Sequence, residues 1–133
     1  MYVCGTTAPA FTRFPQTADG YANLPTVSFV IPNQQHDMHS GSIADADQWL
    51  KDNLGGYANW AQSHNSLLIV TWDEDDSAHG NQIATIFSGA GVKTGTYSEH
   101  INHYNLLATL EQMYGLTKVG SSSTAATISD IWS

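Results

Sequence analysis

The strongest structural signal in this sequence is the continuous apolar run at 67–72, which is followed at once by four carboxylates at 73–76. The run reads Leu-Leu-Ile-Val-Thr-Trp, and β-branched and aromatic residues favour strands. Continuous rather than alternating apolar character is typical of a central strand that is covered on both faces. The sequence therefore predicts a layered domain in which helices cover a sheet.

Two further runs, at 26–31 and 82–87, also predict strands, because each is rich in β-branched or aromatic residues. Prolines flank the first, and the Ser-Gly-Ala-Gly stretch at 88–91 closes the second. Residues 1–25 hold three of the four prolines and show little periodicity. We expect them to be a connecting segment. The polar residues at 121–124 are expected to form a loose tail.

Helix signals occur in two regions. Ser42 lies three residues before Asp45, which resembles a capping box with a shorter acid and predicts a helix start. The Gly-Gly pair at 55–56 interrupts the apolar spacing, so we expect a second short helix that ends near His64. Apolar residues at helical spacing predict a last helix over 102–114.

The order of these elements is strand, helices, strand, strand and helix, which is typical of an α/β architecture with a mainly parallel sheet. A chain of 133 residues with 41% hydrophobic residues fits one compact domain. We expect residues 26–133 to form that single domain. Three strands make a thin sheet, which indicates an incomplete part of a larger unit.

Composition excludes several classes of protein. Four Lys and Arg against twelve Asp and Glu give a net charge of −8, which leaves no electrostatic surface for nucleic acid. No apolar stretch approaches the roughly 18–20 residues that span a bilayer, so we expect no transmembrane segment. The single Cys4 cannot form an internal disulfide, and no signal peptide is visible at the N-terminus.

Polar side chains follow two of the predicted strands, at 36–39 and at 73–76. In open α/β sheets, ligands bind beyond the carboxyl ends of the strands, so two parallel neighbours would bring both groups to one crevice. Four successive carboxylates repel one another, and a half-buried one either takes up a proton or binds a cation. The alternative is a solvated acidic loop or the acidic first turn of a helix.

Histidines supply the other candidates for this crevice. His36 and His39 flank Asp37, whose carboxylate can orient them as bases or metal ligands; a solvated loop is the alternative. His103 falls in the first turn of the last predicted helix, where an anion such as phosphate can bind; a histidine that caps its own helix is the alternative. The remaining histidines are expected at the surface: His64, His79 and His100.

Several motifs occur together and in a fixed order: Pro-Asn-x-x-His-Asp-Met-His-x-Gly at 32–41, Asp-x-Trp-Leu at 47–50, Thr-Trp-Asp-Glu-Asp-Asp at 71–76, Asn-x-Ile at 81–83, and Ile-x-His-Tyr-x-Leu-Leu-x-Thr-x-Glu-x-Met-Tyr-Gly at 101–115. This combination resembles the phosphoesterase family that groups bacterial acid phosphatases with phospholipases C of the non-haemolytic type. That family belongs to the alkaline phosphatase superfamily.

The resemblance implies a three-layer α/β/α sandwich and the hydrolysis of phosphate esters with the help of a divalent metal ion whose identity stays open. It implies that Asp73 and Glu74 bind the metal. It also implies that four residues line the catalytic site: His36, Asp37, His39 and His103. Secretion or a periplasmic location is usual in the resembled family.

The sequence also departs from the family pattern. Family members are longer, and their N-terminal half supplies a Ser or Thr nucleophile and a first pair of metal ligands. The threonines at 6, 7 and 12 lie in a Pro-interrupted segment without strand-to-helix context, and Ser40 stands where an acidic residue is expected. The chain therefore resembles a C-terminal half, which would pair with a missing N-terminal half or with a second copy.

Three functions remain open at this point. The leading one is a phosphate-ester hydrolase of the acid phosphatase or phospholipase C type. The second is a non-catalytic fragment or binding module that retains a metal and needs a partner. The third is a glycosyltransferase-like site for a metal-bound nucleotide sugar, for which Lys93 and Lys118 make a poor lining.

Overall fold

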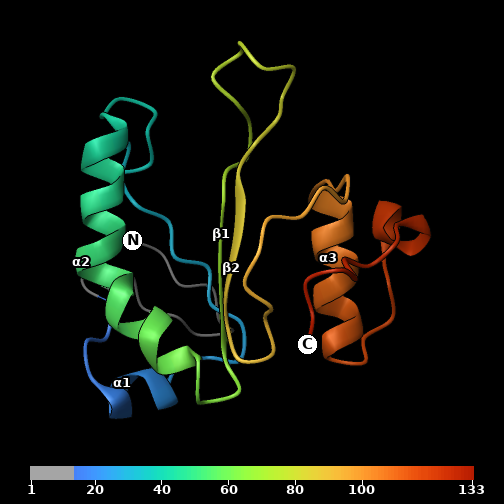
Figure 1. Cartoon of the computed structure of the whole chain (residues 1–133), viewed down its shortest axis with the longest axis horizontal. Coiled ribbons are helices and arrows are strands. Elements are labelled where there is room, and N and C mark those ends of the chain that lie inside the picture. Colours follow the sequence, from blue (N-terminus) through green and yellow to red (C-terminus); the bar gives the residue numbers. More distant parts are fainter. Residues whose placement is uncertain (1–13) are drawn as a thin grey trace. The chain divides into compact units, whose positions relative to one another are not determined.

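The computed structural model describes residues 14–133, whose contacts separate into two units at the boundary between Ala90 and Gly91. The first unit contains the elements α1 (Ala18–Ala22), α2 (Ile43–Ala61), β1 (Leu67–Thr71) and β2 (Thr85–Gly89), labelled in Figure 1. The second unit contains α3 (His103–Met113) and the 3₁₀ helix η1 (Gly120–Thr124). The fold is thus α/β, with a small sheet.

The sheet of the first unit has two antiparallel strands, in a register that pairs Leu67 with Gly89 and Thr71 with Thr85. The expectation of parallel neighbours was wrong for this pair. Its connection at 72–84 contains no helix, and parallel strands need a crossover that is usually helical. The helix α2 lies against one face of the two strands (Figure 1).

Residues 26–31, predicted to form a buried strand, form no strand in the described part of the chain, and the backbone bends at Thr26 and Val27. Phe29 and Ile31 are 56% and 53% exposed, and Val30 packs against the core. The prediction was wrong because β1 pairs with β2 alone in the described part of the chain, so this segment receives no ladder of hydrogen bonds.

The capping box that starts α2 is confirmed. The Ser42 hydroxyl accepts a hydrogen bond from the Asp45 backbone N–H (3.1 Å), and the Asp45 carboxylate accepts one from the Ser42 backbone N–H (3.1 Å). The expected break at the Gly-Gly pair is wrong, because α2 continues through it to Ala61. A Cβ atom at Gly56 would lie 2.5 Å from the Tyr21 hydroxyl, so close packing explains that glycine.

An aromatic cluster forms the core of the first unit. Phe14, Tyr21 and Leu54 are buried, and the rings of Tyr57 and Trp60 pack around them. Part of the predicted connecting segment therefore contributes a helix and two core side chains. The remainder of that segment at 1–13, including Cys4 and the three threonines considered above, lies outside the described residues.

The predicted last helix is confirmed as α3. Asn102 caps it by accepting hydrogen bonds from the backbone N–H groups of Tyr104 (2.9 Å) and Asn105 (3.3 Å). Its buried residues differ from the apolar stripe that predicted it: Ala108, Thr109 and Glu111 are buried, and many of the large apolar side chains are exposed. Helical spacing thus located the helix but not its buried face.

The tail expected to be loose is folded around a buried polar group. Ser122 is fully buried, and its hydroxyl donates a hydrogen bond to the Glu111 carboxylate (2.7 Å). The Val119 backbone N–H donates to the same carboxylate (3.1 Å). These bonds hold η1 against α3, because a buried carboxylate must have its acceptors satisfied.

Among residues 14–133, no helix has both the length and the apolar composition that a membrane crossing requires.

Candidate functional site

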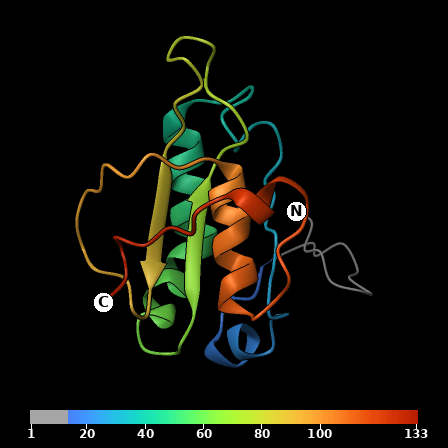
Figure 2. The ribbon, with the colours of Figure 1, turned by 90° about the vertical axis from the view of Figure 1, so that its right-hand side faces the viewer.

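Two polar loops of the first unit lie at the same end of that unit. One, at 32–42, leads into α2, and the other, at 72–84, follows β1. Because α2 begins where β1 ends, both loops lie beyond the carboxyl end of β1 in the two perpendicular views (Figures 1 and 2). The predicted candidates from these two loops therefore share one end of the unit, although the strands are not parallel neighbours.

His36 has a defined orientation in the first loop. Its Nδ1 lies 2.7 Å from the Asn33 side-chain oxygen, and its ring stacks on Trp49 with centroids 6.2 Å apart. An amide oxygen only accepts, so Nδ1 carries the hydrogen and Nε2 of the neutral ring keeps a lone pair. His36 is thus held in one orientation by Asn33 and Trp49. Its Nε2 has no hydrogen-bond partner among the described residues and can act as a base.

The remainder of this loop is held by short-range contacts. Asp37 accepts a hydrogen bond from the His39 backbone N–H (2.8 Å), and His39 Nδ1 lies 3.2 Å from the Ser40 hydroxyl. A Cβ at Gly41 would lie 1.8 Å from the Gln35 carbonyl oxygen, so only glycine fits. Asp37 therefore fixes the loop backbone beside His39 and does not orient its ring in this structure.

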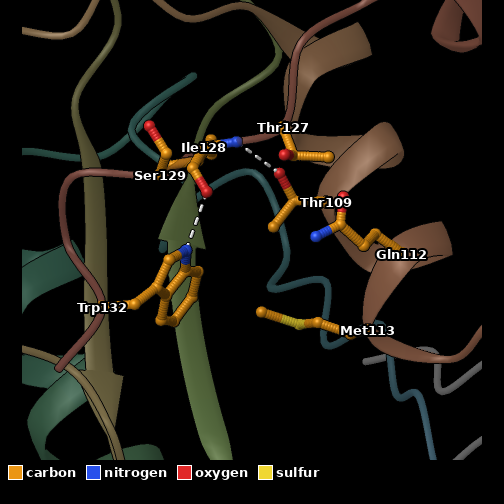
Figure 3. Close-up of a pocket in the computed structure, with 7 residues that line it drawn as sticks. All are labelled: Thr109, Gln112, Met113, Thr127, Ile128, Ser129 and Trp132. Atoms are coloured by element: carbon orange, nitrogen blue, oxygen red, sulfur yellow. Dashed lines mark hydrogen bonds between the residues drawn. The ribbon is translucent and has the colours of Figure 1, made fainter.

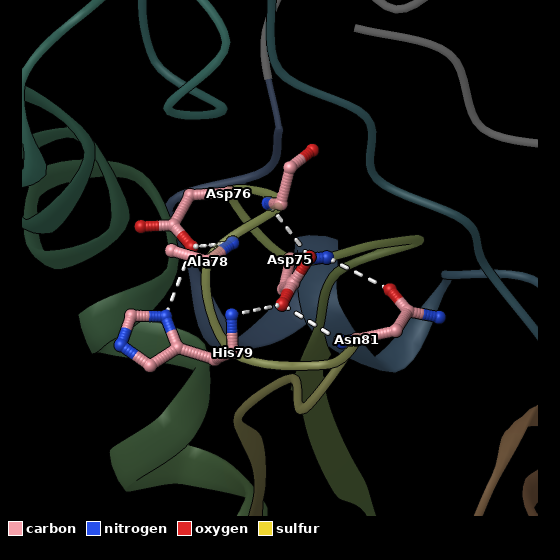
Figure 4. Close-up of polar contacts among 6 residues, drawn as sticks. Asp75, Asp76, Ala78, His79 and Asn81 are labelled. Atoms are coloured by element: carbon pink, nitrogen blue, oxygen red, sulfur yellow. Dashed lines mark hydrogen bonds and ion pairs between the residues drawn. The ribbon is translucent and has the colours of Figure 1, made fainter.

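Asp75 organises the second loop. Its carboxylate accepts hydrogen bonds from the backbone N–H groups of Ser77 (2.7 Å), His79 (2.9 Å) and Asn81 (2.8 Å), as Figure 4 shows. Burial raises the pKa of Asp75, but the backbone hydrogen bonds outweigh it, and the pKa lies below its usual range. The expected half-buried carboxylate is therefore Asp75, and three backbone N–H groups satisfy it as an acceptor.

Asp76 and His79 form an ion pair beside it, with Asp76 Oδ1 2.9 Å from His79 Nδ1. The hydrogen bond to Asp76 raises the pKa of His79. Potential ligand atoms of Asp75, Asp76 and His79 all lie within 4.8 Å of one another. Sequence analysis placed His79 at the surface, which is confirmed, but it missed this grouping; the Asp-x-x-His spacing at 76–79 is the signal that could have found it.

The two carboxylates predicted to bind the metal, Asp73 and Glu74, follow one residue after the end of β1, and both are exposed. They belong to the same loop as the Asp75 turn, which holds the backbone that carries them. Carboxylate oxygens are ligands that hard divalent ions prefer. The carboxylate oxygens of Asp73 and Glu74 and their exposure therefore fit a divalent metal ion at this end of the first unit.

His103 is the first residue of α3 in the second unit, as predicted, and it is exposed. The alternative in which it caps its own helix is wrong, because the Asn102 side chain is the cap. The assignment of His103 to the catalytic site stays a prediction.

The second unit also contains a cavity of about 350 Å³, which Figure 3 shows. Its lining consists of Thr109, Gln112, Met113, Thr127, Ile128, Ser129 and Trp132. The Trp132 indole N–H donates to the Ile128 carbonyl (2.7 Å), and the Ile128 N–H donates to the Thr109 hydroxyl (2.9 Å). No acid or base lines this cavity, so it offers no group for proton transfer.

Comparison with known proteins defines the class to which this fold and these loops belong. Residues 4–117 match the model of the Phosphoesterase family. The match covers most of the chain and includes both polar loops and the start of α3. The chain belongs to the phosphoesterase family, which confirms the resemblance seen in its motifs.

Curated relatives of this chain are named phosphatases. The phosphatidylinositol-3-phosphatase of Mycobacterium tuberculosis is 59% identical over 122 residues, which are 92% of this chain and 40% of that protein. An acid phosphatase of Aspergillus fumigatus is 27% identical over 90% of this chain and 28% of its own length. A phosphate-repressible acid phosphatase of Penicillium chrysogenum is 28% identical over 74% and 25%, respectively.

The chain thus spans 40% or less of the length of these relatives. No solved structure matches it.

Proposed function

We propose that this chain carries part of the active site of a metal-dependent phosphatase that hydrolyses phosphate esters. The observation that carries the proposal is the 59% identity, over 92% of the chain, to a protein named phosphatidylinositol-3-phosphatase. Two polar loops with carboxylates and a positioned histidine at one end of the first unit supply chemistry of the right kind. A phosphoinositide is accordingly the proposed substrate class.

Asp73 and Glu74 would hold the divalent ion in this proposal. Asp75 is less suited to that role, because its carboxylate already accepts three backbone hydrogen bonds that hold the loop together. When bound, such an ion polarises a phosphoryl oxygen and lowers the pKa of a nucleophile. Asp75 would then act as a positioning residue for its two neighbours.

In this proposal, the histidines would donate protons or hydrogen bonds to the substrate. Nε2 of His36 is left free by the Asn33 contact, so protonated His36 can donate to the leaving oxygen or to a phosphoryl oxygen. The family resemblance also implies a phosphate contact for His103, which stays a prediction; this residue lies in the first turn of α3, where the helix dipole favours an anion. Asp37 and His39 would shape the loop around the substrate.

The finer fold is part of the same proposal. In longer family members, the two-stranded sheet and residues 26–31 would join a larger sheet of a three-layer α/β/α sandwich. Large sheets of such folds often carry an antiparallel edge strand on an otherwise parallel sheet. The observed antiparallel pair of β1 and β2 is compatible with that position.

The test is hydrolysis of p-nitrophenyl phosphate and of a short-chain phosphatidylinositol 3-phosphate by the purified chain, with and without a chelator, together with elemental analysis. We expect chelator-sensitive phosphate release and a bound divalent metal. Asp73→Asn should lower the rate at least about 10²–10³-fold, as loss of one such transition-state contact does. Asp47→Asn, which changes an exposed carboxylate on α2 in the same way, is the matched control and should leave the rate unchanged.

Unchanged turnover of Asp73→Asn would overturn the metal-ligand assignment. Bound metal without any phosphate release would favour the non-catalytic, metal-retaining module instead. Family membership gives no support to the nucleotide-sugar alternative.

A further inference from the structure

Residues 27–31, called here the edge segment, form no helix or strand, follow a bend of the chain at Thr26 and Val27, and have no backbone partner among residues 14–133. No backbone hydrogen bond within residues 14–133 involves their N–H or C=O groups, and they belong to no strand ladder. Such a row of unpaired backbone groups is a template for another strand. Pro25 and Pro32 lie just outside the segment and limit how far a strand pair could extend.

The side chains of the edge segment alternate between two environments. Val30 packs against the aromatic core of the first unit, which fixes one face of the segment. Val27, Phe29 and Ile31 form the other face, and they are 36%, 56% and 53% exposed. The segment therefore presents an apolar stripe together with backbone groups that have no partner among residues 14–133. The strand β2, by comparison, exposes only Ile86 among its large apolar residues.

Charge selects the occupant of this edge. Two copies of a chain with a net charge of −8 repel each other over most of their surfaces. No Asp, Glu, Lys or Arg lies between Gly20 and Gln35, so two copies can approach along the edge segment without bringing like charges together. Phe29 is the middle residue of the edge segment. In an antiparallel pair of two edge segments, Phe29 therefore faces Phe29, and Val27 faces Ile31.

We propose that the edge segment is a self-association surface, on which a second copy of this chain adds its own residues 27–31 as an antiparallel strand. The pair is isologous, with Phe29 on the two-fold axis. Three apolar cross-strand pairs and the backbone ladder hold it. Five residues per copy form a small interface, so association depends strongly on protein concentration. The proposal does not rest on the phosphatase function.

Light scattering of the whole chain over a range of concentrations tests the association. We expect a monomer of 14.4 kDa when dilute and twice that mass when concentrated. Hydrogen exchange should show protection of the amides of 27–31 that rises with concentration. A mass of 14.4 kDa at every concentration would overturn the proposal. Protection of these amides in the dilute monomer would also overturn it, because the segment would then be paired within one chain.

Charge substitutions at the axis test the register. Phe29→Lys and Phe29→Glu should each weaken self-association at least about tenfold, because like charges then face each other. A mixture of the two variants should associate again, which only a residue that faces its own copy can produce. Ile86→Lys, at a similar exposure of 52%, is the matched control and should not change the mass. The proposal fails if Ile86→Lys dissociates the pair and Phe29→Lys does not.

Discussion

Aromatic rings form the core of the unit that ends at Ala90, whereas a buried carboxylate organises the unit that begins at Gly91. In the first, Phe14 and Tyr21 pack with side chains of α2. In the second, Glu111 on α3 accepts hydrogen bonds from the η1 region. The difference teaches that the first unit depends on volume and shape, and the second on the pairing of specific polar atoms.

The largest expected effect is the loss of an aromatic core side chain. Phe14 is 2% exposed and packs edge-on against the Tyr57 ring, with centroids 5.7 Å apart. Phe14→Ala should reduce the free energy of unfolding of the first unit by about 3–5 kcal/mol, because a cavity replaces the ring. Chemical denaturation followed by tryptophan fluorescence measures this, and Phe14→Leu should lose much less. A loss below about 1 kcal/mol would contradict the aromatic core.

A smaller effect is expected from the buried carboxylate of the second unit. Glu111→Gln places an amide nitrogen where one of two donors, the Ser122 hydroxyl or the Val119 N–H, needs an acceptor. We expect a destabilisation of about 1–3 kcal/mol. Hydrogen exchange should show it in α3 and η1 and not in α2. Asp47→Asn is an exposed control, and equal loss of protection in both units would disprove the local network.

The two capping boxes should behave alike, which tests whether the difference between the units is confined to their cores. Ser42→Ala and Asn102→Ala each remove a side-chain acceptor from a helix start. Each should cost about 1 kcal/mol, measured as faster amide exchange in the first turn of α2 or α3. The variants Ser42→Thr and Asn102→Ser keep a side-chain acceptor and should retain most of the protection. Loss in one unit only would show that capping depends on the core beneath it.

The smallest expected effect is a pH dependence of the second unit. Burial, together with the nearby Glu99 carboxylate, raises the pKa of Asp130. A raised pKa in the folded state means that its favourable contribution is complete below pH 3.8 and is lost as the pH rises through the raised value. Asp130→Asn should therefore stabilise this unit at neutral pH and flatten its pH profile, as thermal unfolding would show. A profile that Asp130→Asn leaves unaltered would exclude this role.

Local signals predicted several elements well. The Ser42–Asp45 pattern located the start of α2, and the apolar spacing at 102–114 located α3, because capping and helical periodicity are short-range. The apolar run at 67–72 predicted β1 for the same reason. Strand direction was not predictable in this way, because it depends on the path of the connection at 72–84.

In the candidate site too, some features were predictable from local sequence and others were not. Residue identity indicated the carboxylates after β1 and the histidines at 36, 39 and 103, but not which carboxylate holds the loop. Asp75 took that role because the turn at 77–81 aims three backbone N–H groups at it. Hydrogen bonds of this kind depend on backbone conformation, which composition does not reveal.

By itself, the sequence determined the family, the helix starts and the chemistry available in the two polar loops, since these depend on residue type and close spacing. The tertiary structure decided that β1 and β2 run antiparallel, that residues 27–31 have no backbone partner among residues 14–133, and that Glu111 and Ser122 meet in the interior. These features join residues that are distant along the chain or leave them unpaired. The physical reason is that burial and backbone pairing are properties of the packed whole rather than of any local segment.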